Sequence, residues 1–466
     1  MNAAADRPDS RGVHLGWYLK LLASTAGVAF LGFLVISSFG ERLTNPAVAM
    51  VTTASRPIGE LLSVTALLVR LPIALAAVIA ATRIMGWLFA RFSQPPVVGE
   101  LTAGILLGPS VLGALAPGLQ AALFPDAVIP PLSLLSQVSV VLFMFIVGIE
   151  LDTSMLSHAA RPALVISHVG TAVPFLAGSA LALVLYPSLG GHVSFDVFAL
   201  FVGVSLSVTA FPVLARILTD FALHRTRIGA VAISAAAVGD VMAWCLLAGV
   251  AGLARAQAGA GLMTTALTIV FLGVMLGVLR PLVARLAERP VSTGSAMALA
   301  AGLALAVVTS HAIGIHAIFG AFLFGAMIPS HSPAAVAVTG RVQGAVRLLL
   351  PAFFAVTGLH TEVTLISGAA AWSTCLAILL VACAGKFGGS YVAARTAGLR
   401  GRDALAIGAL MNTRGLVELV VLNVGLSLGV ISPTLFAMLV LMALVTTATT
   451  SPVLWMLGWR PTSHKS

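Results

Sequence analysis

The sequence predicts an all-α polytopic membrane protein with about 14 transmembrane helices. Of its 466 residues, 59% are hydrophobic and only 9% are charged, whereas soluble domains are about half apolar and about one quarter charged. Apolar stretches of about 20 residues, long enough to cross a bilayer, recur from end to end. Basic residues gather in alternate connecting segments, as they do in membrane proteins.

The apolar stretches define the expected domain organisation. Residues 1–63 hold one extra N-terminal transmembrane helix and a loop, 64–457 form the main transmembrane domain, and 458–466 are a short tail. We expect no cytosolic regulatory domain, because no connecting segment is long enough for one. The expected spans are 17–39, 64–83, 97–116, 130–150, 162–186, 195–215, 228–250, 262–280, 294–311, 313–329, 348–360, 364–394, 403–429 and 433–457.

The placement of charge predicts the topology. Of the 25 Lys and Arg residues, 19 fall on the side of the two termini, four on the other side and two within the membrane. This skew follows the positive-inside rule, so we expect a multi-pass protein of the cell (inner) membrane with both termini in the cytoplasm. The net charge of +10 is therefore a topology signal, and nucleic acid is not an expected partner.

Two pairs of similar segments predict an internal repeat. Phe145–Asp152 resembles Phe354–Glu362, and Gly99–Pro109 more loosely resembles Gly320–Pro329. The first pair is separated by an odd number of expected spans, so the two halves would insert in opposite orientations. Inverted repeats of this kind are typical of secondary transporters.

In each half, one apolar span is predicted to be interrupted. Ser205–Pro212 carries hydroxyls and a proline, and Met411–Glu418 places Asn, Thr, Arg and Gly at mid-membrane depth. Irregular backbone at that depth is tolerated only where it lines protein or a water-filled cavity. We therefore expect two broken helices that cross near the midplane and present carbonyls and helix ends to an ion.

Charged residues within the expected spans indicate the function. Asp240 lies in the middle of the stretch 228–250, and inserting a charge at that depth costs at least about 2.5–3.5 kcal/mol. Lys386 and the pair Arg414/Glu418 are also intramembrane. The spacing of the pair, i and i+4, allows it to act as a structural brace or to handle ions directly. Together these residues favour a protein that moves small cations or protons.

The segments Gln94–Pro109, Ser207–Leu218, Ile233–Trp244, Gly385–Gly389 and Met411–Asn423 closely resemble the monovalent cation:proton antiporters. The likeness is to the Kef-like group, especially its plant-type cation/H+ exchanger branch with a sodium/hydrogen exchanger domain, and covers about residues 64–456. It implies a homodimer in which a core domain moves against a dimerisation domain, the two being interleaved in sequence. It also implies a 13-helix core, with the first span as an addition.

The resemblance carries site residues onto this sequence. Asp240 matches the carboxylate that binds the metal (a monovalent cation) and the proton, and Lys386 matches the basic residue near the crossing. The residue before the key Asp is usually Asn or Asp in relatives, but here it is Gly239. A site with one titratable negative charge favours electroneutral exchange. The remaining candidates are Ser207, Thr209, Ala210 and Phe211 on the first broken helix, and Asn412, Thr413, Arg414 and Glu418 on the second.

We predict a secondary antiporter that exchanges a monovalent cation, K+ before Na+, for H+ by competition at Asp240. Hydroxyls and carbonyls of residues 205–211 would complete the coordination of the cation. A channel-like cation pathway and a proton-coupled exporter of an organic cation are the alternatives. An enzyme is not expected, because neither His-Glu-x-x-His nor Gly-x-Ser-x-Gly occurs. No cofactor is expected; the partners are the two ions and membrane lipid.

Overall fold

The computed structural model describes residues 15–40, 43, 64–150, 161–223, 226–255, 261–290, 292–313 and 317–459, and these are almost entirely helical. Within this part, 11 helices are long and apolar enough to cross a membrane, or 12 if the bent pair 401–427 is one span. Two shorter apolar helices, α10 (Phe195–Ser207) and α16 (Ala317–Ala326), lie where two further spans are expected. The helical membrane fold is confirmed, and the number 14 stays a prediction. Most of residues 1–63 and 460–466 lie outside the described residues.

The first half of the chain contains α1(Leu15–Gly40), α3(Val64–Arg91), α4(Pro96–Leu107), α5(Leu112–Leu115), α6(Pro117–Leu123), α7(Ile129–Glu150), α9(Arg161–Leu189), α10(Phe195–Ser207), α11(Phe211–Asp220) and α12(Arg227–Arg255). The second half contains α13(Gly261–Gly273), η2(Val274–Leu279), α14(Arg280–Ala287), α15(Thr293–Ile313), α16(Ala317–Ala326), α17(Pro333–Leu359), η3(Val363–Leu365), α18(Gly368–Cys383), η4(Ala384–Gly388), α19(Gly389–Thr396), α20(Gly401–Met411), α21(Leu416–Ser427) and α22(Pro433–Met456).

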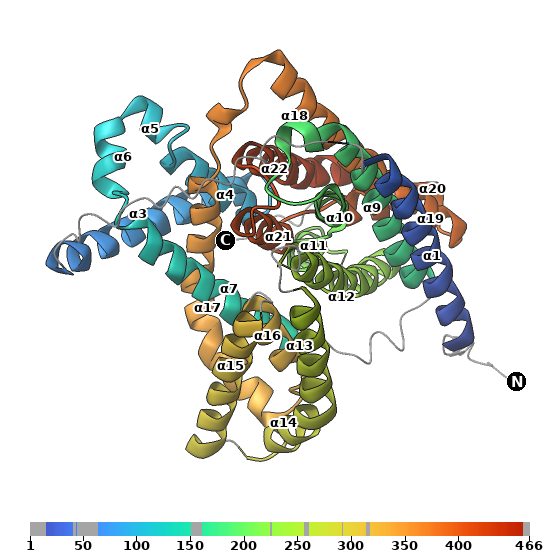
Figure 1. Ribbon diagram of the computed structural model, residues 1–466, viewed down its shortest axis with the longest axis horizontal. Coiled ribbons are helices and arrows are strands. Elements are labelled where there is room, and N and C mark those ends of the chain that lie inside the picture. The colour runs from blue at the N-terminus through green and yellow to red at the C-terminus, as the bar shows by residue number, and fades with distance from the viewer. Residues whose placement is uncertain are drawn as a thin grey trace, which may run out of the picture.

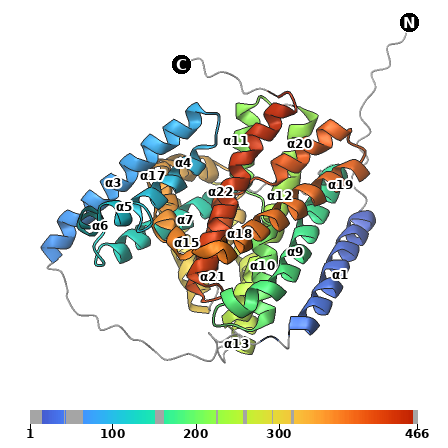
Figure 2. The ribbon, with the colours of Figure 1, turned by 90° about the horizontal axis from the view of Figure 1, so that it is seen from above.

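The helices form two groups (Figures 1 and 2). In one group, α9 packs against α1, α10, α12 and α19, and α20 packs against α19 and α22. In the other, α4 and α7 both pack against α17, with α3 beside α4 and α16 beside α7. The expected extra helix is thus α1, and it contacts the first group, along α9 and α10.

Close backbone contacts repeat between the two halves. Gly104 of α4 lies so near the Ala355 backbone of α17 that no Cβ would fit, and Gly148 of α7 lies equally near the Phe322 backbone of α16. The segments around these glycines are the ones that resemble each other in sequence: α4 corresponds to α16, and the end of α7 to the end of α17. The same helix contact is therefore made twice, which supports the internal repeat.

One expected boundary is wrong. The span expected at 348–360 is the second half of α17, which begins at Pro333. Ser332 caps this helix by accepting a hydrogen bond from the Ala335 amide, and Pro333 occupies its first turn. A serine cap followed by proline is a strong start signal for a helix. The apolar criterion missed it because Arg341 and Arg347 interrupt the hydrophobic run within the helix.

Candidate functional site

The first break separates α10, which ends at Ser207, from α11, which begins at Phe211. Val208 and Ala210 both have extended backbone, so the helical hydrogen-bond ladder stops there. Pro212 lies in the first turn of α11, a position where its missing N–H is not needed. The proline therefore starts the second half-helix instead of kinking a continuous one.

The second break lies between Met411 and Leu416 and crosses the first. The two halves, α20 and α21, are bent by 40°. The amide of Ala210 donates to the Thr413 carbonyl oxygen at 3.0 Å, and the hydroxyl of Thr209 donates to the Met411 carbonyl oxygen at 2.9 Å. The expectation that the two irregular segments meet is thus borne out by direct hydrogen bonds between them.

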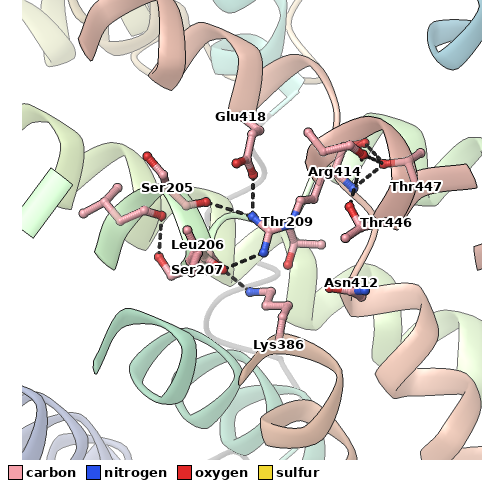
Figure 3. A network of polar contacts seen from close by, with 12 residues as sticks. Ser205, Leu206, Ser207, Thr209, Lys386, Asn412, Arg414, Glu418, Thr446 and Thr447 are labelled. Carbon is pink, nitrogen blue, oxygen red and sulfur yellow. Dashed lines mark hydrogen bonds and ion pairs between the residues drawn. The ribbon is translucent and has the colours of Figure 1, made fainter. Parts of the chain in front are cut away.

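Two cationic side chains saturate the end of α10 (Figure 3). A helix leaves its last four carbonyls without partners inside the helix. Arg414 donates to the carbonyl oxygens of Ser205 and Leu206, each at 2.8 Å, and Lys386 donates to that of Ser207. The Ser207 hydroxyl donates to the fourth, Val204, at 2.8 Å. Positive charge at this point also complements the negative end of the helix dipole.

Arg414 is fixed from several sides. Its guanidinium pairs with Glu418 at 2.6 Å, and neither side chain is exposed. The predicted i, i+4 pair is therefore confirmed, and its cationic member also caps another helix. Thr447 of α22 holds the backbone of Arg414, because its hydroxyl accepts from the Arg414 amide at 2.9 Å and donates to the Arg414 carbonyl oxygen at 2.7 Å.

Asp240 lies within the protein, midway along α12, with only 6% of its surface exposed. Lys386 and the backbone N–H of Phe211 are the groups that act electrostatically on its carboxylate. The carboxylate thus occupies the N-terminal end of α11, where the helix dipole favours an anion. Within the described part of the chain, Oδ1 of Asp240 and Oδ1 of Asn412 are buried and accept no hydrogen bond.

Lys386 approaches the crossing from a π-helical turn, η4. Its ammonium donates to the Gly170 carbonyl oxygen of α9 at 2.8 Å, in addition to Ser207. A Cβ at Gly385 would come within 3.0 Å of Pro174, so this glycine permits the turn to pack closely against α9. Such π-turns inside α-helices often occur at functional sites.

The structure brings the expected residues to one crossing and adds hydrogen bonds that the sequence did not indicate. The carbonyls of residues 205–207, expected as cation ligands, already accept hydrogen bonds from Arg414 and Lys386. Sequence reasoning missed the Gly170 carbonyl and Thr447. The run of threonines at 446–450 in an otherwise apolar helix was a usable signal for Thr447. No sequence pattern marks a backbone carbonyl such as that of Gly170.

Two crossed broken helices around a buried carboxylate define a membrane protein of the ion-transporter class. The family description "Sodium/hydrogen exchanger, transmembrane" matches residues 75–456. The chain therefore belongs to the sodium/hydrogen exchanger family, as its motifs predicted.

Named relatives cover most of the chain. The Na(+)/H(+) antiporter NhaS4 of Synechocystis sp. is 41% identical over 387 residues, which is 81% of this chain and 94% of that protein. The Cation/H(+) antiporter 15 of Arabidopsis thaliana is 37% identical over 82% of this chain and 47% of its own length. The K(+)/H(+) antiporter 1 of Saccharomyces cerevisiae is 36% identical over 78% and 44%. The chain thus spans about half of the plant and yeast proteins.

A solved structure shares the fold. The sodium proton antiporter MjNhaP1 from Methanocaldococcus jannaschii, solved at pH 8, superimposes with a TM-score of 0.59. The match covers 84% of this chain and 97% of that one, at 13% sequence identity. At this identity the likeness concerns the arrangement of the helices alone.

Proposed function

We propose that the protein is a secondary active antiporter that exchanges one monovalent cation for one proton, with both ions competing for Asp240. The observation that carries this proposal is the burial of Asp240 against an N-terminal helix end, with one oxygen that accepts no hydrogen bond within the described residues. A buried carboxylate needs neutralisation, because an isolated charge is costly in a low-dielectric interior. A proton and an alkali cation each supply it.

The charges at the crossing support electroneutral exchange. Four ionisable side chains are buried there: Asp240 and Glu418 are acidic, and Lys386 and Arg414 are basic. With all four ionised, the site is neutral. Adding one cation or one proton at Asp240 gives the same net charge, provided that Lys386 stays protonated. The two loaded forms then cross the membrane field with equal charge, so the membrane potential does not drive the exchange.

Lys386 is the third competitor for Asp240. Without a bound ion, its ammonium opposes the carboxylate and holds the carbonyls of Gly170 and Ser207. An arriving alkali cation would displace the ammonium from Ser207, whose carbonyl oxygen then becomes a ligand together with Oδ1 of Asp240. Oxygen ligands of this kind suit hard cations. Occupation by any one of the three competitors excludes the others, which couples the two ion flows.

The two helix groups provide the moving parts of alternating access. We propose that the group containing α9–α12 and α18–α22 is the core domain, and that α3–α7 with α15–α17 belong to the dimerisation domain of a homodimer. The ion site lies wholly within the first group, since Asp240, Lys386 and both breaks belong to it. The core would cross only when Asp240 is neutralised by a bound cation or a bound proton. Both termini would face the cytoplasm of a cell whose inner membrane holds the protein.

K+ remains the favoured cation and Na+ the next, on the resemblance to the plant-type branch. One relative is named for Na+ and another for K+, so the names favour neither ion. The channel-like pathway and the organic-cation exporter remain the alternatives. A channel would conduct without strict coupling to protons, and an exporter would need a cavity larger than an alkali ion at Asp240.

Purified protein in proteoliposomes with an internal pH dye tests the proposal. Addition of K+, Na+, Li+ or Rb+ should release protons with saturable kinetics, and acidification should raise the apparent KM for the cation without lowering the maximal rate. Asp240→Asn should abolish this flux while the protein stays folded. Asp220→Asn, in an exposed pair with Arg216, is the control and should retain it. Cation-driven proton flux that persists in Asp240→Asn would remove Asp240 from the mechanism.

A further inference from the structure

A cavity of about 360 Å³ is lined by residues of α1, α9, α10 and α12. Helix α1 lies along the outer side of the first helix group, beside α9 (Figure 2). Apart from His168 and two threonines, its lining is apolar or sulfur-containing. The exposed side chains of Leu22, Phe30 and Leu246 stand at its rim, so it opens towards the bilayer between α1 and α12. An apolar cavity that opens to the hydrocarbon phase suits a hydrocarbon chain.

Helices α1 and α9, which both line the cavity, run in the same direction. Arg161, at the start of α9, stacks over the ring of Trp17 at 4.9 Å. Further along, Phe33 contacts Phe175 with ring centroids 6.3 Å apart. The first of these contacts brings a cation and an aromatic ring to the N-terminal end of the cavity. Arginine and tryptophan together are typical of the membrane interface.

The depth of the cavity fits one leaflet. On α1 its lining extends from Leu22 to Phe33, which at about 1.5 Å per residue is roughly 16 Å along the helix. Half of a hydrocarbon core of about 30 Å is about 15 Å. Both cations near the mouth, Arg161 and Lys20, are exposed, and each precedes the first lining residue of its own helix. A lipid with its phosphate at these cations would therefore place an acyl chain along the cavity.

We propose that this cavity is a binding site for an anionic phospholipid, with one acyl chain between α1 and α12 and the phosphate against Arg161 and Lys20. The apolar lining selects the chain, and the two positive charges select the headgroup. The site depends on α1, which lies outside the matched family domain 75–456.

The site lies directly behind the helix that carries Asp240. Met242, Cys245 and Leu246 line the cavity, and at 100° per residue they project from the face of α12 opposite Asp240. On the other wall, His168 and Thr171 flank Gly170, whose carbonyl binds Lys386. The lipid would therefore support both helices that position the charged groups at the crossing.

Native mass spectrometry of the full-length protein in detergent tests the site. The probes are dipalmitoylphosphatidylglycerol and dipalmitoylphosphatidylcholine, which share chains and differ in headgroup charge. The wild-type protein should retain the anionic lipid more tightly than the zwitterionic one. Arg161→Gln and Lys20→Gln should each reduce this preference by about fivefold, the effect of one basic residue near an anionic headgroup.

A bulky residue in the cavity should displace the chain. Ala29→Trp, which fills the cavity from α1, should abolish retention of both lipids, whereas Val28→Trp on the exposed face of the same turn (63% exposed) should not. Unfolding temperatures identify a variant that fails to fold, and the two Gln variants then decide alone. Equal retention of both lipids by the wild-type protein, or unchanged anionic-lipid retention in Ala29→Trp or in the Gln variants, would overturn the proposal.

Discussion

The two broken helices occupy matching places in the repeat, yet their polar groups are held in different ways. The second break carries its own charges, since Arg414 and Glu418 pair within it and Thr447 secures the Arg414 backbone. The first break has no charged side chain of its own between Val208 and Ala210. It depends on charges from other segments: Arg414 and Lys386 donate to the carbonyls at the end of α10, and Asp240 of α12 acts on the start of α11.

This difference separates a structural charge pair from an exchangeable one. Arg414 makes hydrogen bonds to three partners and has a dedicated counter-ion. Within the described part of the chain Asp240 forms no salt bridge, and the Lys386 ammonium that acts on it donates to two backbone carbonyls instead. The second break thus fixes the geometry of the crossing, and the first offers a place where one positive charge can replace another. Matching motifs in a repeat do not guarantee matching roles.

The largest expected effect is on stability, at the second break. Arg414→Met would leave the buried Glu418 without a counter-ion and three oxygen acceptors at the crossing without their donor. The free energy of unfolding should fall by about 3–5 kcal/mol, as for other broken buried pairs. Thermal unfolding in detergent measures the loss.

Two controls sharpen this prediction. Arg216→Met breaks a pair of the same i, i+4 spacing that is partly exposed, so it should cost only about 0–1 kcal/mol. In Arg414→Met/Glu418→Leu no charge is left unpaired, so stability should partly return. Equal losses in the buried and exposed variants would show that Arg414 is not a structural brace.

The next effect concerns the two hydrogen bonds by which Thr447 holds the backbone of Arg414 at the second break. Thr447→Val keeps the shape of the side chain but removes the hydroxyl that bonds both the amide and the carbonyl of Arg414. The unfolding free energy should fall by about 1–3 kcal/mol, the cost of an unsatisfied buried polar group. The control is Thr449→Val, since among the described residues the Thr449 hydroxyl bonds the Thr446 carbonyl of its own helix and no other group. If both variants unfold at the same temperature, the two Thr447 hydrogen bonds do not stabilise the second break.

At the first break we expect a change in ion affinity instead. Lys386→Gln keeps an amide donor for the two carbonyls and removes the positive charge that competes for Asp240. The apparent KM for the cation should fall by about tenfold, which corresponds to about 1.4 kcal/mol, near the lower limit for a hydrogen bond from a charged group. Initial rates of dye dequenching at a series of cation concentrations measure it. A higher KM would mean that Lys386 assists the cation instead of replacing it.

The smallest structural change tests electroneutrality. A Cβ at Gly239 would approach one described atom within 4 Å, Ser167 Oγ at 3.6 Å, so position 239 can accept a side chain. Gly239→Asp would add a second carboxylate beside Asp240. The site could then carry two protons in one direction and one cation in the other, so the loaded forms would differ in charge. Transient currents on a solid-supported membrane should appear in this variant and be absent in the wild type and in Gly239→Ala. A current of the same size in the wild type would contradict one-for-one exchange.

Much of the molecule could be predicted from local patterns. The helical membrane fold, the two interruptions and the Arg414–Glu418 pair follow from hydrophobic runs, helix breakers and i, i+4 spacing, and each is present. The start of α17 was missed because two arginines lie within one continuous helix. The role of residues 205–207 as cation ligands stays a prediction, and the sequence could not show that their carbonyls accept hydrogen bonds from side chains 179 to 209 residues away in the chain.

The sequence by itself determined which charges are buried, because so few polar residues interrupt the apolar spans and each must have a use to offset its cost of insertion. Only the tertiary structure decided which partners Asp240, Lys386 and Arg414 find on other segments of the chain. Asp240, Lys386 and Arg414 belong to three segments far apart in the chain, and a hydrogen bond between such segments depends on distances of about 3 Å that no spacing along the chain specifies. The division between a fixed pair and an exchangeable one therefore arises from packing.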